Sequence, residues 1–185
     1  MSLSAAARFF SLLALVAGAG AIGIVVLAIV PAGRRHLAVL REPAVWLAWV
    51  VAATATFGSL YFSEVQNLLP CRLCWFQRIA MYPLAAILLV GAVRRDPNVR
   101  WYAVPLAAIG LVVAVYHSLI EWFPQWESGS CDPVVPCSSY YFREFGFVTL
   151  AFMAICGFAA VLALLLFVPT SPTPVPHLEE SSHDH

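Results

Sequence analysis

The chain has 185 residues, of which 62% are hydrophobic and 11% charged, and its formal net charge is zero. Ordinary soluble domains are roughly 45–50% apolar, so this composition excludes that class and indicates an integral membrane protein. All ten basic residues are arginines and they form no basic stripe, so no nucleic-acid partner is expected.

The first apolar run, residues 9–30, is long enough to cross a hydrocarbon core of roughly 30 Å. A signal peptide has a shorter apolar part of roughly 7–15 residues, so this run is interpreted as a retained helix. The following segment, residues 31–43, carries three arginines against one glutamate. Such a loop is typical of the cytoplasmic side.

Four further spans are expected, at residues 44–62, 74–93, 101–120 and 147–168. A second arginine-rich turn follows the span 74–93, so both arginine loops are expected inside and both cysteine-bearing loops outside. The sequence therefore predicts an all-α membrane protein. Its expected parts are an additional N-terminal transmembrane helix with its loop (1–43), a four-helix transmembrane bundle (44–168) and a disordered cytoplasmic tail (169–185).

A C-x-x-C pair, Cys71 and Cys74, precedes the third span, and Arg78 follows one turn later. Two thiols at this spacing can form a disulfide, and a helix N-terminus together with Arg78 would stabilise a thiolate at Cys74. The same pair could instead be half of a zinc or iron–sulfur site. Arg78 could also simply extend to the membrane interface.

A second pair, Cys131 and Cys137, lies in the loop 121–146, just after His117 and Glu121, which are four residues apart and share one helix face. Cysteines outside the cytoplasm lie where disulfides persist, and a proline-containing loop suits an exchangeable disulfide better than a metal site. Two dithiols facing one membrane surface can pass two electrons by thiol–disulfide exchange.

A fifth cysteine, Cys156, lies in the apolar middle of the last span and is expected to be an inert packing residue. The tail histidines His177, His183 and His185 could bind a metal weakly, but a disordered tail explains them equally well. No metal site is therefore expected.

These motifs resemble the DsbB family of bacterial disulfide-bond formation proteins, and in particular its BdbC-like branch. The resemblance rests on Pro70-Cys71-x-x-Cys74-x-x-x-Arg78, then Tyr116-His117, the second cysteine pair and one further span, in that order. It covers residues 44–168. It implies a four-helix bundle in the bacterial cytoplasmic membrane that oxidises a DsbA-like thioredoxin-fold partner and passes the electrons to a quinone, either ubiquinone or menaquinone.

The resemblance also implies roles for single residues. The loop pair Cys131 and Cys137 would exchange with the partner, and Cys71 and Cys74 would lie next to the quinone. Arg78 would polarise the quinone and His117 would lie near it, and Glu121 is also expected at the quinone site. Three features depart from the best-known members: a glutamate instead of glutamine at 121, the short interval between Cys131 and Cys137, and the first helix.

Two other functions stay open on the sequence alone. A membrane thiol reductase would send electrons outward, but the arginine loops contain no cysteine to receive them from a cytoplasmic donor. A structural protein with two stabilising disulfides would leave Arg78 unexplained.

Overall fold

The computed structural model describes residues 2–31, 33–127, 131 and 134–168. The helical elements follow in the order Leu3–Ile29 (α1), Arg34–Leu37 (α2), Ala38–Leu40 (η1), Ala44–Leu60 (α3), Tyr61–Val65 (η2), Arg72–Arg94 (α4), Val99–Trp122 (α5), Pro124–Trp126 (η3) and Leu150–Phe167 (α6). Among these, α1, α3 with η2, α4, α5 and α6 are long and apolar enough to cross a membrane. This confirms the predicted fold class, an all-α membrane protein with a helix preceding the four-helix bundle.

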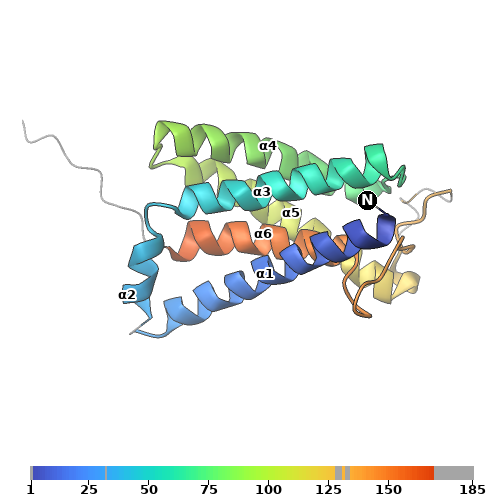
Figure 1. Ribbon diagram of the computed structural model, residues 1–185, viewed down its shortest axis with the longest axis horizontal. Coiled ribbons are helices and arrows are strands. Elements are labelled where there is room, and N and C mark those ends of the chain that lie inside the picture. The colour runs from blue at the N-terminus through green and yellow to red at the C-terminus, as the bar shows by residue number, and fades with distance from the viewer. Residues whose placement is uncertain (1, 32, 128–130, 132–133, 169–185) are drawn as a thin grey trace, which may run out of the picture.

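The helices α3, α4, α5 and α6 form the bundle, and α1 packs along α6 (Figure 1), with the Phe10 side chain reaching Gly58 of α3. Alanines line the contacts inside the bundle because small side chains let membrane helices approach closely. The buried members include Ala44, Ala48 and Ala52 of α3 and Ala103, Ala107 and Ala114 of α5.

The two arginine-rich segments, α2 with η1 and the turn between α4 and α5, lie at one end of the bundle, and the cysteine loops lie at the other (Figure 1). The turn is tight because Arg95 closes α4 in the left-handed conformation, with φ of 53°. The N-terminal end of α1 lies at the cysteine end, where Arg8 Nε is 3.4 Å from Glu144 Oε2.

The helix ends differ from the expected ones by a few residues. The second span continues through the π-helical turn η2 to Val65, whereas it was expected to end at residue 62. The last span begins at Leu150 rather than residue 147 because the Thr149 side chain caps the helix by accepting a hydrogen bond from the N–H of Phe152.

Cys156 is buried in α6, close to Gly18 of α1, where an added Cβ would lie 2.9 Å from the cysteine sulfur. This contact fits the packing role predicted for it. The tail that was expected to be disordered, with its three histidines, lies outside the described residues.

Candidate active site

The first cysteine pair forms the N-terminal turn of α4. Cys71 is the N-cap residue in an extended conformation, and its sulfur accepts a hydrogen bond from the Cys74 N–H at 3.3 Å. The two sulfur atoms lie 2.9 Å apart with both thiols free. The C-x-x-C spacing therefore places both sulfurs on one helical turn, within reach of thiol–disulfide exchange.

His117 of α5 completes this group from the neighbouring helix. Its Nε2 atom lies 3.6 Å from the Cys71 sulfur, and its Nδ1 atom lies 3.0 Å from the side-chain nitrogen of Gln77. Because an amide nitrogen only donates, Nδ1 is the acceptor and Nε2 carries the proton of the neutral ring. The protonated Nε2 is thereby directed at the Cys71 sulfur.

These contacts place thiolate character on Cys71. The hydrogen bond from the Cys74 thiol, assisted by His117 and opposed by burial, lowers the pKa of Cys71 to about 4. From the sequence the thiolate was expected at Cys74, beside Arg78. The difference arises because the N-cap sulfur receives hydrogen bonds from Cys74 and from the neighbouring helix, a partner that spacing along α4 does not reveal.

The second pair, Cys131 and Cys137, forms a disulfide with a Cα–Cα distance of 6.0 Å. Glu127 holds the loop at Cys137. One of its carboxylate oxygens accepts a hydrogen bond from the Cys137 N–H at 2.7 Å, and the other accepts one from the Ser138 hydroxyl at 2.6 Å. The same loop is tied to the segment before Cys71, because the Tyr141 hydroxyl donates to a backbone carbonyl there at 2.7 Å.

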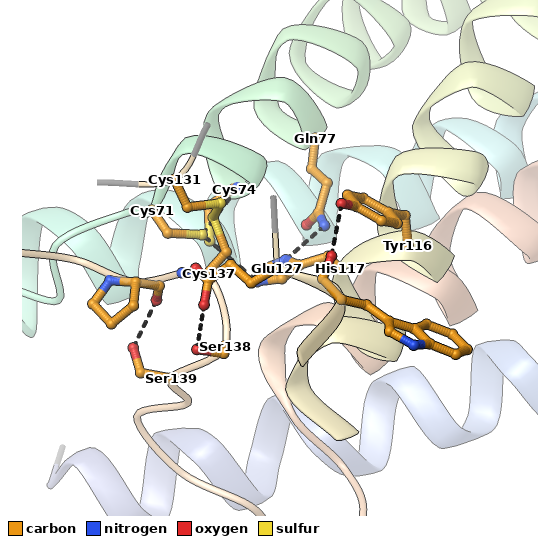
Figure 2. The surroundings of a disulfide bond; sticks show 12 residues. Cys71, Cys74, Gln77, Tyr116, His117, Glu127, Cys131, Cys137, Ser138 and Ser139 are labelled. Atoms are coloured by element: carbon orange, nitrogen blue, oxygen red, sulfur yellow. Dashed lines mark hydrogen bonds between the residues drawn. A yellow bond between two sulfur atoms is a disulfide. The ribbon is translucent and has the colours of Figure 1, made fainter. Parts of the chain in front are cut away.

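The loop disulfide lies directly beside the helix thiols. Cys137 and Cys71 belong to one buried cluster with Leu73 and Ile120, and the other two cysteines pack against it. Figure 2 shows the four cysteine side chains gathered at the start of α4. The short interval between Cys131 and Cys137 therefore does not keep the second pair away from the first.

Arg78 lies one turn further along α4 and contacts α3. Its Nε donates to the Ser59 hydroxyl at 3.0 Å and a terminal nitrogen donates to the Ser59 carbonyl at 3.2 Å. The guanidinium also lies 5.3 Å from the centre of the Trp75 ring. Arg78 is thus held by specific partners inside the bundle, which argues against simple extension to the interface.

Two cavities meet at Cys74. A large apolar cavity of about 380 Å³ is lined by Cys74, Gln77 and Arg78 together with side chains from α1, α3 and α6. A small cavity of about 20 Å³ is lined by both Cys71 and Cys74, by His117 and by the loop after Cys137. Cys74 therefore faces both cavities, whereas Cys71 faces only the one on the loop side.

Of the three residues expected to contact a quinone, only Arg78 lines the large cavity. His117 and Glu121 line the small one instead. Glu121 is buried and accepts a hydrogen bond from the Thr149 hydroxyl at 2.6 Å, which joins α5 to the start of α6. His117 and Glu121 thus lie on the side of the thiols that faces the loop disulfide.

Three polar residues of the site were not predicted from the sequence: Gln77, Ser59 and Glu127. Gln77 and Ser59 are polar positions within apolar spans, a pattern that often marks function in membrane helices. Glu127 gave no comparable signal because it is one of several carboxylates in a loop.

The donor atoms of Cys71, Cys74 and His117 lie within 4.8 Å of one another, as do those of Glu127, Cys131 and Cys137. A structural zinc site usually takes four ligands. Neither of these groups, drawn from the described residues, contains a fourth.

Comparison with known proteins identifies the family. Residues 41–168 match the family model described as disulfide bond formation protein DsbB. The chain is 43% identical over 129 residues to a probable disulfide formation protein C 2 of Bacillus anthracis, covering 70% of this chain and 92% of that protein. It is 40% identical over 121 residues to disulfide bond formation protein C of Bacillus subtilis strain 168, covering 65% of this chain and 88% of that protein.

A probable disulfide formation protein of Oceanobacillus iheyensis is 40% identical over 136 residues, covering 72% of this chain and 94% of that protein. No solved structure gives a significant match. The family model and these relatives agree with the two adjacent cysteine pairs at the end of a bundle of apolar helices. The chain accordingly belongs to the DsbB family and is a multi-pass membrane protein of disulfide-bond formation.

Proposed function

We propose that this protein reoxidises a DsbA-like thioredoxin-fold protein outside the cytoplasm and passes the electrons to a membrane quinone, ubiquinone or menaquinone. The observation that carries the proposal is the position of Cys74, which lies between the loop disulfide and a large apolar cavity. The protein would lie in the bacterial cytoplasmic membrane with its cysteine loops outside, since both arginine-rich segments lie at the opposite end.

The first exchange uses the loop pair. A thiolate of the reduced partner attacks the sulfur of Cys131, the Cys131–Cys137 bond breaks, and Cys137 leaves as a thiolate. The second thiolate of the partner then attacks the mixed disulfide and releases Cys131. The partner leaves with a disulfide, and its two electrons and two protons remain with the loop pair or the solvent around it.

The second exchange transfers the electrons to the helix pair. Cys137 attacks Cys71 of a Cys71–Cys74 disulfide, and Cys74 leaves as a thiolate. Cys131 then attacks Cys137, which restores the loop disulfide and frees Cys71. The pairing present in this structure, with free thiols at 71 and 74 and a disulfide at 131–137, corresponds to the state after this exchange.

The large cavity fits a quinone. Its walls are predominantly apolar, its volume of about 380 Å³ lies in the range of small-molecule sites, and Cys74 and Arg78 border it. A bound quinone would take up two electrons and two protons to become a quinol. Closure of the Cys71–Cys74 disulfide would supply the two electrons, and Cys74 borders the cavity that would receive them. One proton would come from the Cys74 thiol and the other from water, because Cys71 is already a thiolate.

Arg78 and His117 have separate tasks in this scheme. The guanidinium of Arg78, fixed by Ser59, is placed to stabilise negative charge on an oxygen atom in the cavity. His117 holds a proton at Nε2 beside the Cys71 sulfur, on the side away from the large cavity. The ring would therefore stabilise the Cys71 thiolate that is released when Cys131 attacks Cys137.

The proposal is tested with purified protein, a reduced DsbA-like thioredoxin-fold protein and either quinone. We expect one quinone consumed for each partner disulfide formed, with loss of turnover in Cys74→Ala and full turnover in Cys156→Ala, whose cysteine lies outside the site. Absence of quinone consumption by the unchanged protein would refute the proposal. A requirement for a cytoplasmic reductant would instead identify an outward-directed thiol reductase.

A further inference from the structure

The large cavity has a wall that the family match does not include. Helix α1 precedes residue 41, where that match begins, yet it contributes Phe10, Leu13, Ala14, Val16 and Ala17 to the cavity lining. The candidate electron-acceptor site of this chain is therefore completed by its additional helix.

The contacts of α1 give its position relative to Arg78 and Ser59, which are polar residues of the cavity lining. Phe10 lies against α3 beside Ser59, because a Cβ added to Gly58 would be 2.8 Å from the Phe10 ring, and the Phe10 and Phe62 ring centres are 5.4 Å apart. Ser59 in turn binds Arg78. Phe10 therefore lies at the level of the guanidinium.

The remaining α1 lining residues lie further from the cysteine end, since α1 runs away from it. Ala14 and Ala17 are one and two turns beyond Phe10, about 6 and 10 Å along the axis at 1.5 Å per residue. Ala17 and Val51 both line the cavity and pack against the same cluster of alanines, and Val51 lies eight residues before Ser59 in α3. Most polar lining residues thus lie near the cysteine end of the cavity, Thr54 of α3 lies further along, and the α1 side of that further part is apolar.

Helix α1 is docked rather than loosely attached. Ser11 is fully buried and its hydroxyl lies 3.9 Å from the sulfur of Met153, itself a lining residue of α6. Arg8 reaches Glu144 in the segment that follows the second cysteine pair. A wall held in this way can define the shape of a site.

We propose that α1 forms the binding wall for the polyprenyl tail of the quinone, with the tail lying along Ala14 and Ala17 between α1 and α3. This inference rests on the proposed function and adds to it a determinant of acceptor specificity. A quinone head placed at Cys74 and Arg78 directs its tail into the apolar part of the cavity. The small side chain of Ala14 leaves the room that the tail occupies, and Leu13 and Val16 flank it.

The test compares acceptors with and without a tail. Steady-state turnover is measured with benzoquinone and naphthoquinone head groups, each carrying a long polyprenyl tail or none, for the unchanged protein, Ala14→Leu and Ala14→Phe. The matched control is Ala19→Phe, which adds the same ring to an exposed position of α1 outside the cavity. Thiol–disulfide exchange with the reduced partner in the absence of quinone reports whether each variant is folded.

We expect the KM for the tailed acceptors to rise roughly tenfold in Ala14→Phe, the equivalent of losing about two buried methylene contacts, and less in Ala14→Leu. The KM for the tail-less acceptors and the exchange with partner should stay close to those of Ala19→Phe. Equal changes for tailed and tail-less acceptors, or none beyond the control, would overturn the role of α1 in binding the tail. The apolar part of the cavity would then be a site for a membrane lipid chain. The proposed function fails separately, if the unchanged protein reduces none of the four acceptors.

Discussion

His117 and Cys71 are 46 residues apart in the chain, yet the imidazole Nε2 atom lies 3.6 Å from the cysteine sulfur. Gln77, six residues after Cys71, binds the other ring nitrogen. The helix that carries the thiols therefore also fixes the tautomer of the histidine that contacts them. This relationship joins α4 to α5 at the point where the two cysteine pairs meet.

The first prediction concerns the reactivity of Cys71. Its pKa is lowered to about 4, mainly by the Cys74 thiol and further by His117, so it should be a thiolate at neutral pH and alkylation should slow only as the pH falls through that value. Cys74→Ala should move the midpoint up towards the usual value of about 8.5, and His117→Ala should move it less. The measurement is the pH dependence of alkylation at Cys71, read by mass spectrometry. A larger effect from His117→Ala than from Cys74→Ala would contradict the assignment.

The second prediction separates, at Arg78, the two half-reactions of the proposed function. Arg78→Met removes both hydrogen bonds to Ser59 and the charge beside the cavity, so quinone reduction should fall roughly ten- to hundredfold, as for loss of a charged hydrogen bond of about 1.5–3 kcal/mol. Exchange of the Cys131–Cys137 disulfide with the partner should persist. Arg78→Lys should be intermediate because it keeps the charge but loses the planar fork.

Arg94→Met is the control for this series, since Arg94 is exposed in the last turn of the same helix. Steady-state kinetics against quinone concentration and single-turnover exchange with the partner give the two readouts. If quinone reduction in Arg78→Met equalled that in Arg94→Met, Arg78 would have no part in the acceptor site.

The third prediction is the orientation in the membrane. In a chain whose native cysteines are replaced by alanine, Val134→Cys in the outer loop should react with an impermeant maleimide in intact cells. Val39→Cys in η1 should react only after lysis, because η1 lies at the arginine-rich end. Both side chains are exposed, at 84% and 79%, so access to the thiol is matched. The reverse labelling pattern would place the cysteine loops in the cytoplasm.

The fourth prediction tests the packing between α5 and α6. A Cβ at Gly110 would collide with the ring of the fully buried Phe158, so Gly110→Ala should lower the free energy of unfolding by about 1–3 kcal/mol. Adding Phe158→Leu should recover part of this loss. Gly20→Ala, which meets nothing within 4 Å, should be neutral. The measurement is the thermal unfolding midpoint in detergent, and equal midpoints for Gly110→Ala and Gly20→Ala would refute the predicted contact.

The amino-acid sequence by itself determined the membrane class, the five spans and the position of the first thiol pair on a helix start. These are local properties: span length follows from runs of apolar residues, and a C-x-x-C spacing brings both sulfurs onto one turn whatever surrounds them. The resemblance to the DsbB family rested on the same local motifs, and the family match confirmed it.

Only the tertiary structure decided which groups meet between helices. The contact of His117 with Cys71 depends on how α4 and α5 are rotated against each other, and the spacing of residues along one helix does not fix that rotation. The large cavity depends on side-chain volumes from four helices at once, including α1, which no family motif covers. Thiolate character falls on Cys71 mainly through the hydrogen bond from the Cys74 thiol on the same turn, and further through His117 of α5. The cavity that each thiol faces is decided by the neighbouring helices and the loop, because these form the other walls.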